Sequence, residues 1–176
     1  EDFSDRYLEI LGRQAHLVPG AETMVAALAE RFRLAAATNG IADVQRRRFR
    51  LSGLREFIEP LVISEEVGAA KPDPAFFVEL FHRMGEPETS EVLMVGDSLT
   101  SDIAGGAVFG IDTCWFNPAG LRPSAALAPT YDIRELGDLI AILEVADEGL
   151  LGGAGTAPET RPKPVPAARC SRRNCR

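Results

Sequence analysis

The chain has 176 residues, of which 45% are hydrophobic, and this is enough for one domain with a sizeable apolar core. Residues 152–176 carry one acidic and six basic side chains, which leaves 25 acidic and 13 basic side chains, a net charge of −12, in the preceding part. An acidic body argues against a nucleic-acid-binding domain, and no apolar run approaches the ~20 residues that cross a membrane. The sequence has no signal-peptide pattern and no disulfide framework, so we expect a cytoplasmic protein.

The first part of the chain predicts helices around one short strand. Residues 3–16 and 21–32 have the apolar spacing of two helices. Residues 34–37 form a short apolar run that ends in the turn signal Thr38–Gly40, which is typical of a buried strand. Residues 41–52 predict a third helix, rich in arginine, whose charges we expect to form a solvated face.

The second part of the chain alternates between strand and helix patterns. Apolar runs predict strands at 61–63, 92–95, 111–116 and 131–133, and helical spacing predicts helices at 75–84, 99–109 and 135–145. This alternation predicts an α/β fold, with a Rossmann-like parallel sheet that helices cover on both faces. We expect the core to span residues 19–150, and the Gly-, Pro- and Arg-rich composition of residues 151–176 predicts a disordered tail.

Polar side chains follow three of the predicted strands. Thr38 follows the first, Lys71 follows the second after a loop, and Asp97 and Asp102 follow the third. Because ligands bind at the carboxyl edge of parallel sheets, we expect these side chains to share one crevice. Two carboxylates at such a turn would repel unless a hard cation lay between them, and Mg²⁺ fits that arrangement. A phosphate needs donors, a positive charge and a metal, and these residues supply all three.

Each of these residues also has a plainer interpretation. Asp97 could merely cap a helix while Asp102 interacts with the helix dipole. Thr38–Gly40 could be an ordinary turn, and Lys71 could be a solvated loop lysine. Their occurrence together, in chain order at strand ends, favours a phosphate and metal site.

With these motifs the sequence resembles the haloacid dehalogenase superfamily of hydrolases over about residues 15–146. Thr38–Gly40 is similar to the second motif of the superfamily, Lys71–Pro74 to the third, and Gly96-Asp97 with Asp102 to the fourth. One branch, the pyrimidine 5′-nucleotidases, is matched more closely. The stretches that carry this further resemblance are Val62–Gly68, Val92–Asp97, Cys114–Asn117 and Ala128–Tyr131.

The resemblance implies Mg²⁺-dependent hydrolysis of a phosphomonoester, such as a nucleoside 5′-monophosphate, through an aspartyl-phosphate. Thr38 and the backbone amides of Asn39 and Gly40 would then bind the phosphate, and Lys71 would offset its charge. Asp97 would be a ligand of Mg²⁺, and Asp102 would support the metal directly or through water. A sugar-phosphate phosphatase and a non-catalytic phosphate- or nucleotide-binding protein remain alternatives. Dehalogenation shares the fold but has no need of a metal, so the two aspartates argue against it.

The sequence departs from the family at the first motif, an apolar strand that ends in Asp-x-Asp and supplies the nucleophile. Asp2 and Asp5 are three positions apart on a helical pattern, and they do not fit that motif. Residues 1–18 resemble the remnant of a helical cap domain. We therefore expect an incomplete, C-terminal portion of such an enzyme, inactive by itself. The strands beside the absent central strand would either face a gap or close up, and their unpaired edges predict self-association.

Overall fold

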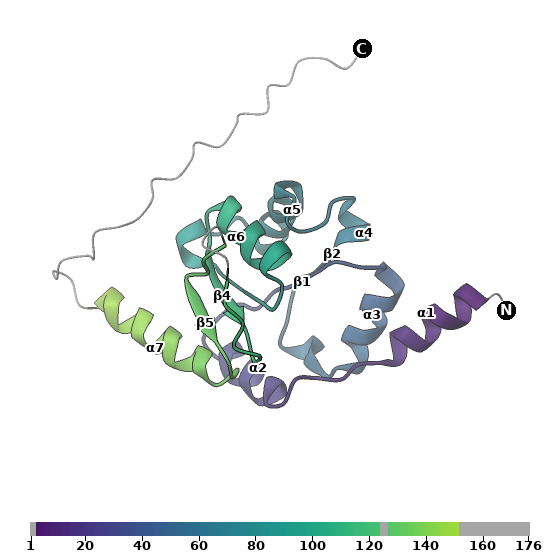
Figure 1. Ribbon diagram of the computed structural model, residues 1–176, viewed down its shortest axis with the longest axis horizontal. Helices are drawn as coiled ribbons and strands as arrows, with labels where there is room; N and C mark the ends of the chain where they lie inside the picture. The colour runs from purple at the N-terminus through teal and green to yellow at the C-terminus, as the bar shows by residue number, and fades with distance from the viewer. Residues whose placement is uncertain (1–2, 124–126, 152–176) are drawn as a thin grey trace, which may run out of the picture.

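The computed structural model of the chain describes residues 3–123 and 127–151 (Figure 1). Apart from Leu151, the predicted disordered tail lies outside the described residues. The strands are β1 (Ala36–Thr38), β2 (Leu61–Ile63), β3 (Leu93–Gly96), β4 (Asp112–Phe116) and β5 (Tyr131–Ile133). The α-helices are α1 (Phe3–Arg13), α2 (Ala21–Ala29), α3 (Ala42–Leu51), α4 (Ser64–Val67), α5 (Pro74–Met84), α6 (Ala104–Phe109) and α7 (Asp138–Leu151). Two 3₁₀ turns, η1 (Leu54–Glu56) and η2 (Thr89–Glu91), and one π-helical turn, η3 (Leu99–Ile103), complete the order.

The strands form two parallel sheets. In the first sheet β1 pairs with β2, and Thr38 lies opposite Ile63. In the second the order is β3-β4-β5, and Met94 lies opposite Thr113. This confirms the predicted α/β class with parallel strands. Among the described strands, β1 and β3 each pair on one side only, and they do not pair with each other. Val95 of β3 keeps 37% of its surface exposed.

One apolar cluster lies under α5 and α6 and joins the two sheets. It contains Val62 of β2, Met94 of β3 and the buried face of α5 formed by Phe76, Phe77, Leu80 and Phe81. The start of α5 is fixed locally, because the Asp73 carboxylate accepts a hydrogen bond from the Ala75 amide and proline occupies the first turn. This core therefore holds the half-sheets together without strand pairing between them.

The opposite face of the β3-β4-β5 sheet is covered by α2 and α7, which lie on the lower side of the molecule in Figure 1. Leu28, Cys114, Ile133 and Leu139 form the buried centre of this second cluster. Burial, and then the negative charges of Asp132 and Asp138, raise the pKa of the Cys114 thiol to about 11. Within the described ranges no helix is long and apolar enough to cross a membrane.

Arg46, Arg48 and Arg50 of α3 are exposed, as the sequence predicts for a solvated face. Arg46 donates two hydrogen bonds to the carboxylate of Glu66, and Arg48 donates one to the backbone carbonyl of Gln14. The helix α1 packs on α3, where a Cβ added at Gly12 would lie 2.9 Å from the Arg47 side chain. The predicted solvated face is therefore present, and two of its arginines also contact neighbouring segments, which the sequence pattern does not report.

Candidate active site

Asp97 lies where β3 ends, at the carboxyl edge of its sheet. Its side chain is exposed, and its backbone carbonyl accepts a 2.9 Å hydrogen bond from the indole nitrogen of Trp115 on β4. Trp115 is only 3% exposed, so this bond ties the turn after β3 to a rigid neighbouring strand. Asp97 does not cap the following helix. That position belongs to Ser98, whose hydroxyl accepts a hydrogen bond from the Ser101 amide.

The turn after Ser98 is a π-helix, where the sequence predicts the beginning of one continuous α-helix over 99–109. The amides of Asp102 and Ile103 both donate to the Ser98 carbonyl, at 2.9 and 3.2 Å. The wider turn brings the Asp102 side chain back over the end of β3, where a Cβ on Gly96 would lie 2.3 Å from a carboxylate oxygen. Single π turns are concentrated at functional sites, and this one places a carboxylate that an α-turn would direct elsewhere.

Asp102 is 5% exposed, and its two carboxylate oxygens make different contacts. Oδ2 accepts a 3.1 Å hydrogen bond from the Ser98 amide. Oδ1 lies 2.8 Å from the Lys71 ammonium, which is ion-pair distance, but without the geometry of a hydrogen bond. Among the described residues Oδ1 therefore has no hydrogen-bond donor, and it is a buried anionic oxygen whose bonding capacity is not fully used.

Lys71 is buried, at 9% exposure, so its interpretation as a solvated loop lysine is wrong. Besides contacting Asp102, its ammonium donates a hydrogen bond to the backbone carbonyl of Ala37 on β1. It also lies 5.9 Å from the ring centre of Phe76. One side chain thus bridges the end of β1 and the turn that follows β3, and so links the two sheets.

Asn39 holds the loop that carries Lys71. Its amide group donates to the Lys71 carbonyl and accepts from the Lys71 amide, each at 2.9 Å, across 32 positions of sequence. The amide of Gly40 donates to the hydroxyl of Ser64 at 2.9 Å, so a phosphate would have to displace that bond. Thr38 is half-buried, and its hydroxyl makes only a long 3.4 Å contact with the Asn39 carbonyl, which leaves it available to a ligand.

The structure thus brings together the ends of β1 and β3 and the Lys71 loop. The carboxylates available to a metal are Asp97 and Asp102, and within residues 3–123 and 127–151 no group of three histidine, cysteine or acidic residues gathers around one point. The donor chemistry fits Mg²⁺, since both groups offer carboxylate oxygens and Asp102 Oδ1 lacks a hydrogen bond. The described residues therefore present two carboxylates at this site, which is an incomplete set of ligands for Mg²⁺.

Three residues of this site escape prediction from the sequence. Trp115 positions Asp97, Ser98 caps the π turn, and Ser64 accepts from the Gly40 amide. Serine after a strand-ending aspartate is a recognisable cap signal, so Ser98 could have been found. The contacts of Trp115 and Ser64 join segments that are distant in the sequence, so no local sequence pattern predicts them.

Comparison with known proteins agrees with the fold and the motifs. The sequence profile of haloacid dehalogenase-like hydrolases matches residues 1–110, and the chain belongs to this family. The HAD-hydrolase YfnB of Bacillus subtilis is 38% identical over 141 residues, covering 80% of this chain and 60% of YfnB. A crystal structure of YfnB bound to magnesium has a TM-score of 0.77 at 37% identity, covering 79% of this chain and 61% of that one.

Two further relatives are pyrimidine 5′-nucleotidases by name. YjjG of Escherichia coli is 39% identical over 126 residues, which are 72% of this chain and 56% of YjjG. PynA of Streptococcus pneumoniae is 37% identical over 142 residues, which are 80% of this chain and 60% of PynA. The chain therefore spans between 56% and 60% of the length of these curated relatives.

Proposed function

We propose that this chain forms the phosphate- and metal-binding half of a Mg²⁺-dependent phosphomonoester hydrolase that acts on nucleoside 5′-monophosphates. The single observation that carries the proposal is the Lys71–Asp102 pair, buried where the ends of β1 and β3 approach each other. A buried ammonium and carboxylate, next to an available hydroxyl and an exposed carboxylate, are the groups that a phosphate and a cation need.

Each residue would have a separate task. The hydroxyl of Thr38 would donate to a phosphoryl oxygen. The ammonium of Lys71 would offset the negative charge of the phosphate, held in place by Asn39 through two backbone bonds. Asp97 and Asp102 would hold Mg²⁺, which would supply charge stabilisation for the phosphoryl group when bound.

No residue of the printed sequence corresponds to the nucleophile of the family. The first motif of the family is a strand ending in Asp-x-Asp, and the printed sequence contains none. The unpaired edges of β1 and β3 would flank such a strand, with Lys71 at its carboxyl end. Loss of a covalent nucleophile typically costs on the order of 10⁶ in rate, so we expect the isolated chain to be inactive.

The substrate class rests on the named relatives YjjG and PynA, which match this chain at 39% and 37% identity. A sugar-phosphate phosphatase is the alternative within the same chemistry. The test uses protein expressed with the coding sequence upstream of Glu1 included. Phosphate release would be measured from pyrimidine and purine nucleoside monophosphates and from a sugar phosphate, in Mg²⁺ and in EDTA.

The matched variants are Asp97→Asn and Asp5→Asn, which remove the same charge. Asp5 lies on α1 and is exposed, so its substitution should leave activity within about 2-fold, as for surface changes. The loss of Asp97 should reduce phosphate release by about 100-fold or more. Absence of any Mg²⁺-dependent phosphate release from the longer protein would contradict the proposal.

A second candidate is binding of phosphate or nucleotide without turnover. It is favoured by the incomplete set of ligands that the described residues present. Calorimetry of this chain with Mg²⁺ and nucleoside monophosphates would test it. The absence of any heat up to millimolar ligand would remove this candidate.

A further inference from the structure

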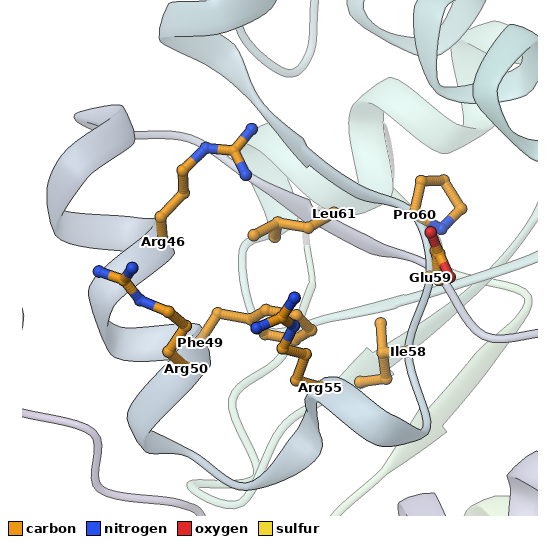
Figure 2. A pocket seen from close by; sticks show the side chains of 8 residues that line it. All are labelled: Arg46, Phe49, Arg50, Arg55, Ile58, Glu59, Pro60 and Leu61. Carbon is orange, nitrogen blue, oxygen red and sulfur yellow. The ribbon is translucent and has the colours of Figure 1, made fainter.

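A hollow of about 480 Å³ lies between the second half of α3 and the segment that enters β2 (Figure 2). Arg46, Phe49 and Arg50 line it from α3, Arg55 lines it from η1, and Ile58 and Leu61 close the other side. Its volume falls within the range of pockets that hold small organic ligands. We call this hollow the arginine pocket.

The arginine pocket is separate from the candidate active site. Leu61 is the first residue of β2, and the candidate site gathers after the last residues of β1 and β3. Because β1 and β2 run parallel, their amino ends lie at the edge of the sheet opposite to their carboxyl ends. A ligand in the arginine pocket would therefore leave Lys71 and Asp97 untouched.

The three arginines of the pocket are not equivalent. Arg46 is neutralised by Glu66, which accepts both of its hydrogen bonds. Arg50 and Arg55 are exposed, and within the described part of the chain neither has a carboxylate at ion-pair distance or a hydrogen-bond partner. Glu59 also lines the hollow, but it makes no ion pair with either arginine. Two uncompensated guanidinium groups thus remain, on a body whose first 151 residues carry a net charge of −12.

The wall of the pocket is apolar. Phe49, Ile58 and Leu61 are half-buried, and in Figure 2 their side chains extend into the space between α3 and the entry to β2. In this view Arg55 lies beside the apolar side chains, whereas the Arg50 side chain extends away from them, so Arg50 borders the pocket only at its outer rim. An inorganic anion would satisfy the arginines and leave this wall in contact with water.

We propose that the arginine pocket binds a small phosphate monoester with an aromatic body. The planar fork of Arg55 matches the oxygens of a phosphate, and the positive charge of Arg50 at the rim adds to the attraction for the anion. The aromatic body covers Phe49 and Leu61, which removes apolar surface from water. The pocket is a second anion site, remote from hydrolysis.

The test is a titration of the full chain with phenyl phosphate in EDTA, followed by amide NMR. Saturable shifts are expected for residues 46–61 and not for residues 38–40 and 96–102. Arg55→Gln should weaken binding by about 10-fold or more, since a hydrogen bond to a charged group is lost, and Arg55→Lys should restore part of it. Inorganic phosphate should bind about 10-fold more weakly than phenyl phosphate, because it lacks the apolar body.

Arg33→Gln is the matched control. It makes the same change in net charge on an exposed side chain outside the pocket, and it should leave the affinity within about 2-fold. Equal losses in Arg33→Gln and Arg55→Gln would overturn the proposal, because they would indicate a general charge effect. Shifts centred on residues 38–40 and 96–102, or no saturation by about 10 mM, would also overturn it.

Discussion

Removing the ammonium of Lys71 should destabilise the folded chain strongly. The Lys71 and Asp102 side chains are 7% and 8% exposed and 2.8 Å apart, so neither group has water as an alternative partner. At an effective dielectric constant of about 20 their attraction is about 6 kcal/mol, and most of it offsets the cost of burying two charges. Lys71→Met leaves the Asp102 carboxylate buried and unpaired, which typically costs about 3–5 kcal/mol of unfolding free energy.

The measurement is urea unfolding followed by circular dichroism, as a double-mutant cycle with Asp102→Asn. Asp102→Asn removes the carboxylate charge that Lys71→Met leaves unpaired. The loss of unfolding free energy in the double variant should therefore be about 2 kcal/mol smaller than the sum of the two single losses. Arg83→Met is the control, since it removes an exposed pair with Glu79 at 2.7 Å that should contribute under about 1 kcal/mol. Additive losses, or a cost of Lys71→Met below that of the control, would refute the role assigned to the buried pair.

Five further outcomes are expected. Gly96→Ala should cost about 1–3 kcal/mol of stability, because the new methyl group would lie 2.3 Å from an Asp102 oxygen. Asn39→Ala should cost about 1–3 kcal/mol by removing both bonds to the Lys71 backbone, measured by urea unfolding. The Cys114 thiol, with its pKa raised to about 11, should resist a thiol-specific reagent at neutral pH. Stability should also fall as the pH rises from about 9 to about 11, by up to about 3 kcal/mol, because the unfolded thiol ionises first. The unpaired edges of β1 and β3 should cause self-association, seen as a sedimentation mass that increases with concentration.

The controls for these outcomes come from the same chain. Gly137→Ala adds a methyl group with nothing within 4 Å, so it should change stability little. If it cost as much stability as Gly96→Ala, the steric argument for Gly96 would be contradicted. Labelling of Cys114 is measured with Cys170 and Cys175 replaced by serine. Rapid labelling in native conditions would contradict its burial. A monomer that melts cooperatively at all concentrations would count against association through the strand edges.

Much of the fold follows from local pattern. The apolar run before Gly96 predicts β3, and helical spacing over 75–84 predicts α5, because hydrophobic spacing acts within a few residues. The hydroxyl, ammonium and carboxylate side chains at the strand ends also indicate a phosphate and metal site from the sequence alone. The predicted single helix over 99–109 is interrupted because contacts of the Asp102 carboxylate select a π turn, and helical spacing does not report such contacts.

By itself, the sequence determined the order of strands and helices, the parallel class and the set of candidate groups, because each depends on neighbours along the chain. Only the tertiary structure decided that Lys71 is buried, that Asn39 holds its backbone, and that Arg46 is neutralised by Glu66. These contacts join residues that are 20 to 32 positions apart. Their strength comes from burial and mutual orientation, and those exist only once the helices have packed the two sheets together.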